Sequence, residues 1–253
     1  MPLAVFAIGL AGCATSGPLH IYSIASADKI GPIRDAGETG VVTVPSFREE
    51  TDVLTGFAYD PFTDHFFLRL APGNRLRVVD RPARVIKREF TVEEIPQSGG
   101  GDLAIKPSNG HIFLLHPTEP RVIELTRLGK WERTFALESL PQPAAGIAYD
   151  APHDRLLVLE HSGASSVVRF YDLAGREQGR CTLARGVAGS LGFDSAAREI
   201  YAALPSSQPS ATSSTSSNAA GIAVFDEKGR LVRTLPAEGE FADVGVRSFV
   251  RVF

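Results

Sequence analysis

A repeat of about 45 residues is the feature that most constrains how this chain can fold. Four segments of similar pattern line up, and one matched position in them holds Asp60, Lys106, Asp150 and Asp194, at steps of 46, 44 and 44 residues. Each segment carries an apolar run, a turn and a second apolar run, as in GIAYDAPHDRLLVLEH. Such a period is typical of arrays in which each unit buries its apolar surface against its neighbours. The four segments are 56–70, 101–116, 146–161 and 190–204.

Each unit reads as four short strands joined by tight turns. The runs FFLRL and LLVL are continuously apolar, which suits inner strands covered on both faces, whereas Arg77-Val78-Val79 alternates in polarity. No segment has the sustained periodicity of an amphipathic helix, so we expect little helix. Packing four-stranded units around an axis gives an all-β fold, the β-propeller. The complete units occupy about 55–98, 99–144, 145–186 and 187–239.

The two ends of the chain are predicted to supply one more blade. Residues 240–253 are expected to form two inner strands, and residues 20–26 and 40–44 two outer strands. Pairing of the N- and C-terminal strands then closes the ring at five blades. Six blades are the alternative if residues 17–54 hold more than half a blade.

The repeated motif GxAYDxxxxxLxVL, followed by VxxYDxxGR, resembles the blades of NHL and YncE-like propellers and, more distantly, those of gluconolactonase-like calcium hydrolases. The resemblance covers about residues 55–239 and implies the architecture. It does not imply one function, because propellers host binding, scaffolding and catalysis alike. The hydrolase resemblance would imply calcium ligands at the strand-entry positions, which here hold Phe57, Leu103, Ile147 and Leu191.

The first twelve residues are almost wholly apolar and end at Cys13. The run is shorter than the ~20 residues of a membrane span, and it is typical of the apolar core of a secretory signal. Leu10-Ala11-Gly12-Cys13 resembles the lipobox of bacterial lipoproteins, in which the cysteine is lipidated. The resemblance implies a signal peptide at 1–12, lipidation of Cys13, a tether at 13–19 and a single propeller domain at 20–253.

Charge and cysteine content narrow the expected partners. Twenty-six Lys and Arg against 29 Asp and Glu give a net charge of -3, without the basic field that nucleic-acid binding needs. With Cys13 lipidated, Cys181 has no disulfide partner, and we expect it to be buried in a strand.

No motif for a catalytic nucleophile, a zinc protease, a phosphate-binding loop or an EF-hand is present, so no cofactor or metal is predicted. The Ser/Thr-rich run at 206–218 is interpreted as a loop insertion.

Acidic residues that recur at matched places are interpreted as structural. Asp60, Asp150 and Asp194 each follow an inner strand, where a carboxylate can accept hydrogen bonds from backbone N–H groups and fix the turn. A positive φ is predicted at the recurring glycines of a later turn, Gly129, Gly175 and Gly229.

Polar residues that do not repeat are the better candidates for a site. Function on a propeller usually gathers where the loops that enter the inner strands meet those that join the second and third strands. The ligand-binding candidates from these two sets of loops are Arg69, His116, Glu160 and His161, and Gln97, Asp102 and Gln142. A His and a carboxylate can act as acid–base partners or metal ligands, and an Arg can hold an anion. A solvated polar rim without a ligand is the alternative.

Two functions remain open. The first is a lipid-anchored module of the bacterial cell envelope, on the periplasmic face of the outer membrane if the cell is Gram-negative. It would be monomeric and would bind an envelope protein or a small ligand, with its lipid in the membrane. The second is a metal-dependent hydrolase or lactonase of the propeller type. The lack of catalytic motifs favours the first function, that of a binding or scaffolding protein rather than an enzyme.

Overall fold

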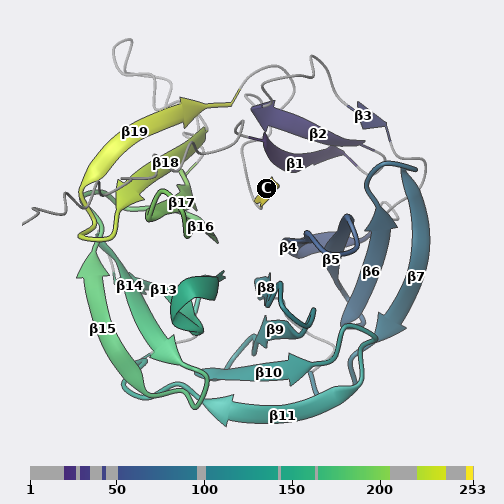
Figure 1. The fold of residues 1–253 in the computed structure, drawn as a ribbon, viewed down its shortest axis with the longest axis horizontal. Helices are drawn as coiled ribbons and strands as arrows, with labels where there is room; N and C mark the ends of the chain where they lie inside the picture. Colours follow the sequence, from purple (N-terminus) through teal and green to yellow (C-terminus); the bar gives the residue numbers. More distant parts are fainter. Residues whose placement is uncertain are drawn as a thin grey trace, which may run out of the picture.

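A computed structural model describes residues 20–26, 29–34, 42–43, 51–95, 101–141, 144–162, 165–205, 221–237 and 249–252. The strands of these residues form antiparallel four-stranded sheets arranged around a common axis (Figure 1). The predicted all-β propeller with four-stranded blades is therefore confirmed. The signal peptide at 1–12, Cys13, the tether and the loop at 206–218 lie outside the described residues.

Each of the four sequence repeats folds into one blade of consecutive strands. The first blade consists of β4 (Val53–Asp60), β5 (His65–Ala71), β6 (Arg75–Asp80) and β7 (Val85–Thr91). The second consists of β8 (Leu103–Ile105), β9 (Ile112–Leu115), β10 (Arg121–Leu125) and β11 (Trp131–Ala136). The third consists of β12 (Gly146–Asp150), β13 (Arg155–Ser162), β14 (Ser165–Asp172) and β15 (Glu177–Thr182). The fourth consists of β16 (Gly189–Asp194), β17 (Glu199–Ala203), β18 (Gly221–Asp226) and β19 (Leu231–Pro236).

A further four-stranded sheet joins the two ends of the described chain, in the order β20-β1-β2-β3. It consists of β1 (His20–Ser26), β2 (Lys29–Arg34), β3 (Val42–Thr43) and β20 (Phe249–Val252). The predicted split of two strands from each end is wrong, because residues 20–43 supply three strands of this sheet. The additional strand, β2, forms a hairpin with β1, in which Ser26 pairs with Lys29. No sixth sheet occurs among the described strands.

Helix is confined to one short turn of 3₁₀ helix, η1 (Ala151–His153), within the described part of the chain. No helix among these residues is long and apolar enough to cross a membrane. The low helix content agrees with the absence of helical periodicity in the sequence.

Burial follows the patterns of the strands. The second strand of each of the four repeat blades has a continuous apolar run, because neighbouring blades pack against both of its faces. All four residues of β9, for example, are buried. The outermost strands β7 and β11 are instead mostly exposed. Cys181 is a free thiol buried in β15, as predicted, and its burial raises the pKa to about 11.

Two of the three recurring turn aspartates, Asp60 and Asp194, accept backbone hydrogen bonds as the repeat predicted. The Oδ1 atom of Asp60 accepts a hydrogen bond from the N–H of Phe62 at 3.1 Å, and Asp194 makes the equivalent contact with Ala196 at 2.9 Å. Asp150 differs, because its carboxylate pairs with the side chain of Arg155 at 2.8 Å. The expected positive φ is found at Gly129, Gly175 and Gly229, with values of 85°, 83° and 79°.

Candidate functional site

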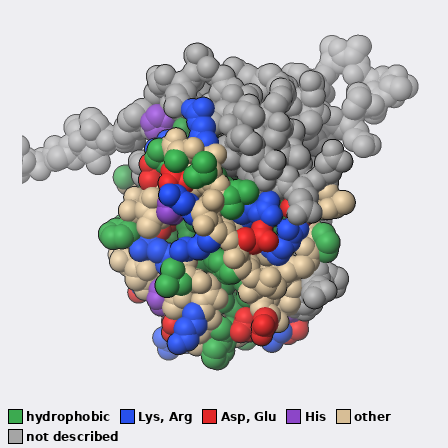
Figure 2. All heavy atoms as spheres, turned by 90° about the vertical axis from the view of Figure 1, so that its right-hand side faces the viewer, with side chains coloured by type: hydrophobic (Ala, Val, Ile, Leu, Met, Phe, Trp, Pro, Cys, Tyr) green, Lys and Arg blue, Asp and Glu red, His purple; other side chains and the backbone are tan. Residues whose placement is uncertain are grey.

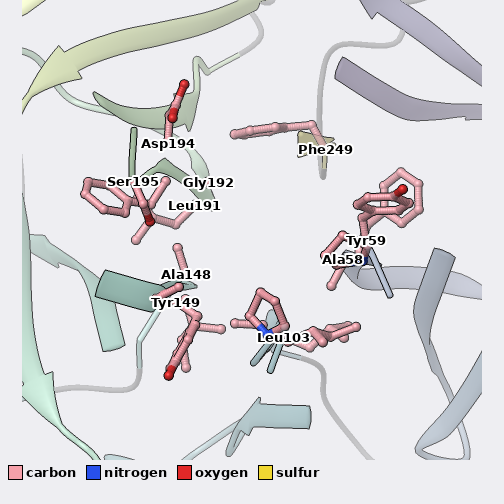
Figure 3. A pocket seen from close by; sticks show the side chains of 18 of the residues that line it. Ala58, Tyr59, Leu103, Ala148, Tyr149, Leu191, Gly192, Asp194, Ser195 and Phe249 are labelled. Atoms are coloured by element: carbon pink, nitrogen blue, oxygen red, sulfur yellow. The ribbon is translucent and has the colours of Figure 1, made fainter. Parts of the chain in front are cut away.

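A cavity of about 370 Å³ lies on the axis of the propeller (Figure 3). Its walls come from the inner strands β4, β8, β12 and β16, together with the ring of Phe249 from β20. At one end the cavity reaches Ala151 and Ala196, which lie in turns that follow the inner strands and are exposed to solvent. The cavity therefore extends from the surface into the centre of the fold.

Small residues at one matched position give the cavity its width. Ala58, Ala104, Ala148 and Gly192 occupy equivalent places in the four inner strands, and all four line the cavity. A Cβ atom on Gly192 would lie 3.1 Å from the Phe249 ring, so a larger residue there would have to displace that ring. The sequence signal for this lining is the small third residue of the repeated GxAYD motif, which was not predicted to be a site residue.

Three polar side chains around the cavity, those of Tyr59, Tyr149 and Asp194, form hydrogen bonds within the protein. The hydroxyl of Tyr59 donates to Asp64 at 3.0 Å, and that of Tyr149 donates to Asp154. The carboxylate of Asp194 accepts hydrogen bonds from backbone N–H groups of its turn. The lining thus presents mainly apolar side-chain surface to a ligand.

Asp102 lies at the opposite end of the inner strands, just before β8. Its Oδ2 atom accepts hydrogen bonds from the N–H groups of Ile147 at 3.1 Å and Leu191 at 3.2 Å, which belong to two other blades. Burial raises the pKa of this carboxyl group to about 7, although hydrogen bonds from those two N–H groups and from those of Leu103 and Phe57 favour the charged form. One carboxylate thus connects the inner strands around the axis.

Glycines in neighbouring blades leave room for this arrangement. Gly56 and Gly146 occupy the positions equivalent to Asp102, and a Cβ atom on Gly56 would lie 2.9 Å from the carbonyl oxygen of Gly101. A Cβ atom on Gly146 would lie 3.0 Å from the backbone of Leu191. The blades can therefore approach each other closely at this end of the axis.

Arg69 is the second buried charge at this end of the propeller. Its Nη1 atom donates hydrogen bonds to the carbonyl oxygens of Gly101 at 3.0 Å and Leu115 at 2.6 Å. Burial lowers its pKa to about 10, and the nearby carboxylate of Asp102 opposes that shift. The guanidinium group is thus still charged at neutral pH and links the first blade to the second.

His116 is buried directly after β9. Its Nδ1 atom accepts a hydrogen bond from the N–H of Glu119 at 3.1 Å, and its Nε2 atom lies 3.1 Å from Nη2 of Arg121. Burial lowers the pKa of the imidazole, and the positive charges of Arg121 and Arg69 act in the same direction. The ring is therefore held neutral near pH 7.

The other predicted site residues are not brought to this cluster by any contact among the described residues. Glu160 forms an ion pair with Arg169 at 2.7 Å on its own blade. The backbone of His161 pairs with that of Ser166 in the third blade, and its side chain lies outside the described part. Gln97 and Gln142 also lie outside it. The structure thus brings together Arg69, Asp102 and His116.

None of the four candidates whose side chains the structure describes (Arg69, Asp102, His116 and Glu160) lines the axial cavity. Among the described residues, no three His, Cys, Asp or Glu side chains are grouped closely enough to hold a metal ion. On the face shown in Figure 2, Lys and Arg side chains are interspersed with Asp and Glu.

Comparison with known proteins identifies the class of fold, a β-propeller. The structure is similar to a chain of a nidogen–laminin complex, with a TM-score of 0.59, 11% identity and coverage of 93% of this chain and 98% of that one. It is also similar to a Bacteroides caccae protein of unknown function, with a TM-score of 0.55, 11% identity and coverage of 93% and 99%. A Myxococcus xanthus glutaminyl cyclase matches with a TM-score of 0.54, 16% identity and coverage of 74% and 71%.

At these identities the likeness extends to the fold alone. No protein-family model and no curated protein sequence matches the chain.

Proposed function

We propose that the chain is a binding protein whose ligand site is the axial cavity. The observation that carries this proposal is a cavity of about 370 Å³ lined by inner strands around the axis and reaching solvent at one end. Ligand sites are typically concave, largely apolar and ~300–1,000 Å³ in volume. A small ligand with an apolar body fits both the volume and the lining.

The walls of the cavity favour selection by shape. Tyr59 and Tyr149 are each oriented by a hydrogen bond to a turn carboxylate, and the Tyr149 ring stacks on Phe113 at 5.9 Å between centroids. Fixed walls reduce the ordering entropy that a ligand must overcome on binding. The similar structures include a chain of a nidogen–laminin complex and a glutaminyl cyclase, so propellers of this shape serve both recognition and catalysis. In the present cavity the side chains of Tyr59, Tyr149 and Asp194 already form hydrogen bonds within the protein, which favours recognition over catalysis.

We also propose that the sheet β20-β1-β2-β3 acts as the fifth blade and completes the wall of the site. Strand β20 lies against both β16 and β4, and Phe249 contributes its ring to the cavity. The N–H of Phe249 donates to Oγ of Ser190 at 3.4 Å, which ties the strand to the fourth blade. Anchoring in the bacterial cell envelope through a lipid on Cys13 remains part of the same proposal and rests on the lipobox resemblance.

A cavity-filling substitution tests the proposed site. Toluene is the probe, and its binding is measured by calorimetry with the purified protein. Ala148→Leu places extra methyl groups in the cavity and is expected to abolish binding, while Ala174→Leu, in an exposed turn, leaves it unchanged. A thermal melt shows whether each variant is folded. Ala58→Leu provides the same test from β4 if Ala148→Leu does not fold.

The proposal predicts loss of toluene binding in the folded cavity variants only. Toluene that binds equally well to wild type and to a folded Ala148→Leu or Ala58→Leu variant would place the ligand elsewhere and contradict the proposal. A wild-type protein that binds no toluene would contradict it as well.

A further inference from the structure

Among the described strands, the inner strand of each of the four repeat blades has one edge that no other strand pairs with. β4, β8, β12 and β16 are each the terminal strand of their sheet, and their free edges face the axis (Figure 1). In an antiparallel pair, the N–H and C=O groups of alternate residues point to the partner strand, and those of the residues between them point away from it. Alternate residues of the inner strands therefore direct their backbone groups to the axis.

The contacts of Asp102 show which residues these are. Its carboxylate accepts the N–H groups of Ile147 and Leu191, so both residues direct their backbone toward the axis. Because the alternation has a period of two residues, Tyr149 and Phe193 do the same, about 7 Å further along the strands. Both residues line the cavity.

The other two blades follow the same alternation. In the second blade the N–H of Lys106 donates to the carbonyl oxygen of His111 at 2.9 Å, so Ile105 before it faces the axis. In the first blade the N–H of Phe57 donates a hydrogen bond to Asp102, so Phe57 faces the axis. Tyr59, two residues further on, therefore faces the axis as well. The four inward N–H groups form what we call the donor ring, contributed by Tyr59, Ile105, Tyr149 and Phe193.

We propose that the cavity takes an uncharged carbonyl compound, in particular an amide, whose oxygen lies near the axis and accepts hydrogen bonds from the donor ring. Asp102 provides the precedent within the same molecule, since one of its oxygens accepts N–H groups from two blades. The carbonyl groups of Ile147 and Leu191 also point inward and can accept an N–H of the amide. The inference rests on the proposed function and specifies its ligand.

The negative charge of a carboxylate ligand should exclude it from the cavity, although it has the same shape as the corresponding amide. Among the described residues that line the cavity, none is Lys, Arg or His. The buried ionisable side chains of the inner strands are carboxylic acids (Asp60, Asp150 and Asp194), and so is Asp102 directly before β8. A buried carboxylate ligand would therefore lose its hydration without gaining an opposite charge. The corresponding neutral amide keeps an acceptor oxygen at the same place and avoids the cost of burying a charge.

Benzamide and benzoate are the matched probes, and toluene supplies the apolar body without the acceptor. Binding is measured by calorimetry at pH 7, and backbone amide resonances are followed by NMR with the wild-type protein. We expect benzamide to bind at least tenfold more tightly than benzoate or toluene. The amide protons of Tyr59, Ile105, Tyr149 and Phe193 should move downfield with benzamide and not with toluene. Ala148→Leu should abolish both effects.

The outcomes separate this inference from the proposed function. If toluene binds in the cavity but benzamide binds no more tightly, or leaves the donor-ring resonances in place, the carbonyl inference is wrong and the binding site stands. Benzoate binding as tightly as benzamide would overturn the requirement for an uncharged ligand. If none of the three probes binds, both proposals fall.

Discussion

Replacing Asp102 by Asn should remove a pH dependence from the stability of the fold. The carboxylate is 3% exposed, and burial raises its pKa from 3.8 to about 7. A carboxyl group whose pKa is raised by folding favours the folded state fully below pH 3.8, and this contribution is lost as the pH rises through 7. Asn keeps an amide oxygen for the N–H groups of Ile147 and Leu191 but cannot ionise.

The size of the effect follows from the pKa. Each unit of pH between the two pKa values changes the free energy of unfolding by ~1.4 kcal/mol, so Asp102 should lower the stability of the wild type by ~3 kcal/mol between pH 5 and pH 8. Urea denaturation at these two pH values measures it. The Asn variant should lack this decrease and should be more stable than the wild type at pH 8.

Asp172→Asn is the matched control. Hydrogen bonds from backbone N–H groups, first that of Arg176, lower the pKa of this partly exposed carboxylate, so it is ionised at both pH values in the folded and unfolded states. Its replacement should leave the difference between pH 5 and pH 8 unchanged. A wild type that is equally stable at both pH values, or an Asp102→Asn variant that keeps the decrease, would refute the reasoning.

Three further predictions test other parts of the structure. Gly175→Ala should cost ~1–3 kcal/mol of stability in urea denaturation, because φ is 83° and a Cβ atom would lie 1.9 Å from the carbonyl oxygen of Ala136. Gly73→Ala is the control and should cost less, because the nearest atom to its Cβ would be 3.7 Å away. Equal costs for the two variants would contradict the packing argument. Arg69→Met should cost about 2 kcal/mol, because the carbonyl oxygens of Gly101 and Leu115 lose their donor, whereas Arg176→Met at the surface should have little effect. An unchanged melt for Arg69→Met would contradict the role given to its guanidinium group. Cys13→Ser should abolish labelling by a palmitate analogue and release the protein from membranes, and an unlabelled, soluble wild type would show that the lipobox resemblance is accidental.

The repeat predicted the blades because the signals that define them are local. Apolar runs such as IFLL and turn residues such as Asp60 and Gly175 determine where strands begin and end, and each lies within one unit of the sequence. The sheet formed by the chain ends was less predictable. Its strands come from opposite ends of the sequence, and β2 contains Pro32, which obscures a strand pattern.

The site was predicted less well, because it depends on what different blades bring to the axis. Polarity without repetition marks Asp102 and Arg69, which are buried and connect the blades to one another. It does not mark the repeated Ala58 and Ala148, whose small side chains form the cavity only when four strands surround one axis. In this fold, repetition itself marks the lining.

The most direct test of the account is a crystal structure determined under xenon pressure, because xenon enters apolar cavities and is located by its anomalous scattering. The account predicts a propeller with a xenon peak on the axis, between Ala58 and Ala148 and beside Phe249, and no such peak in crystals of Ala148→Leu. An axis filled by side chains, or xenon bound only elsewhere in the molecule, would contradict the claim that the centre of this propeller is its ligand site.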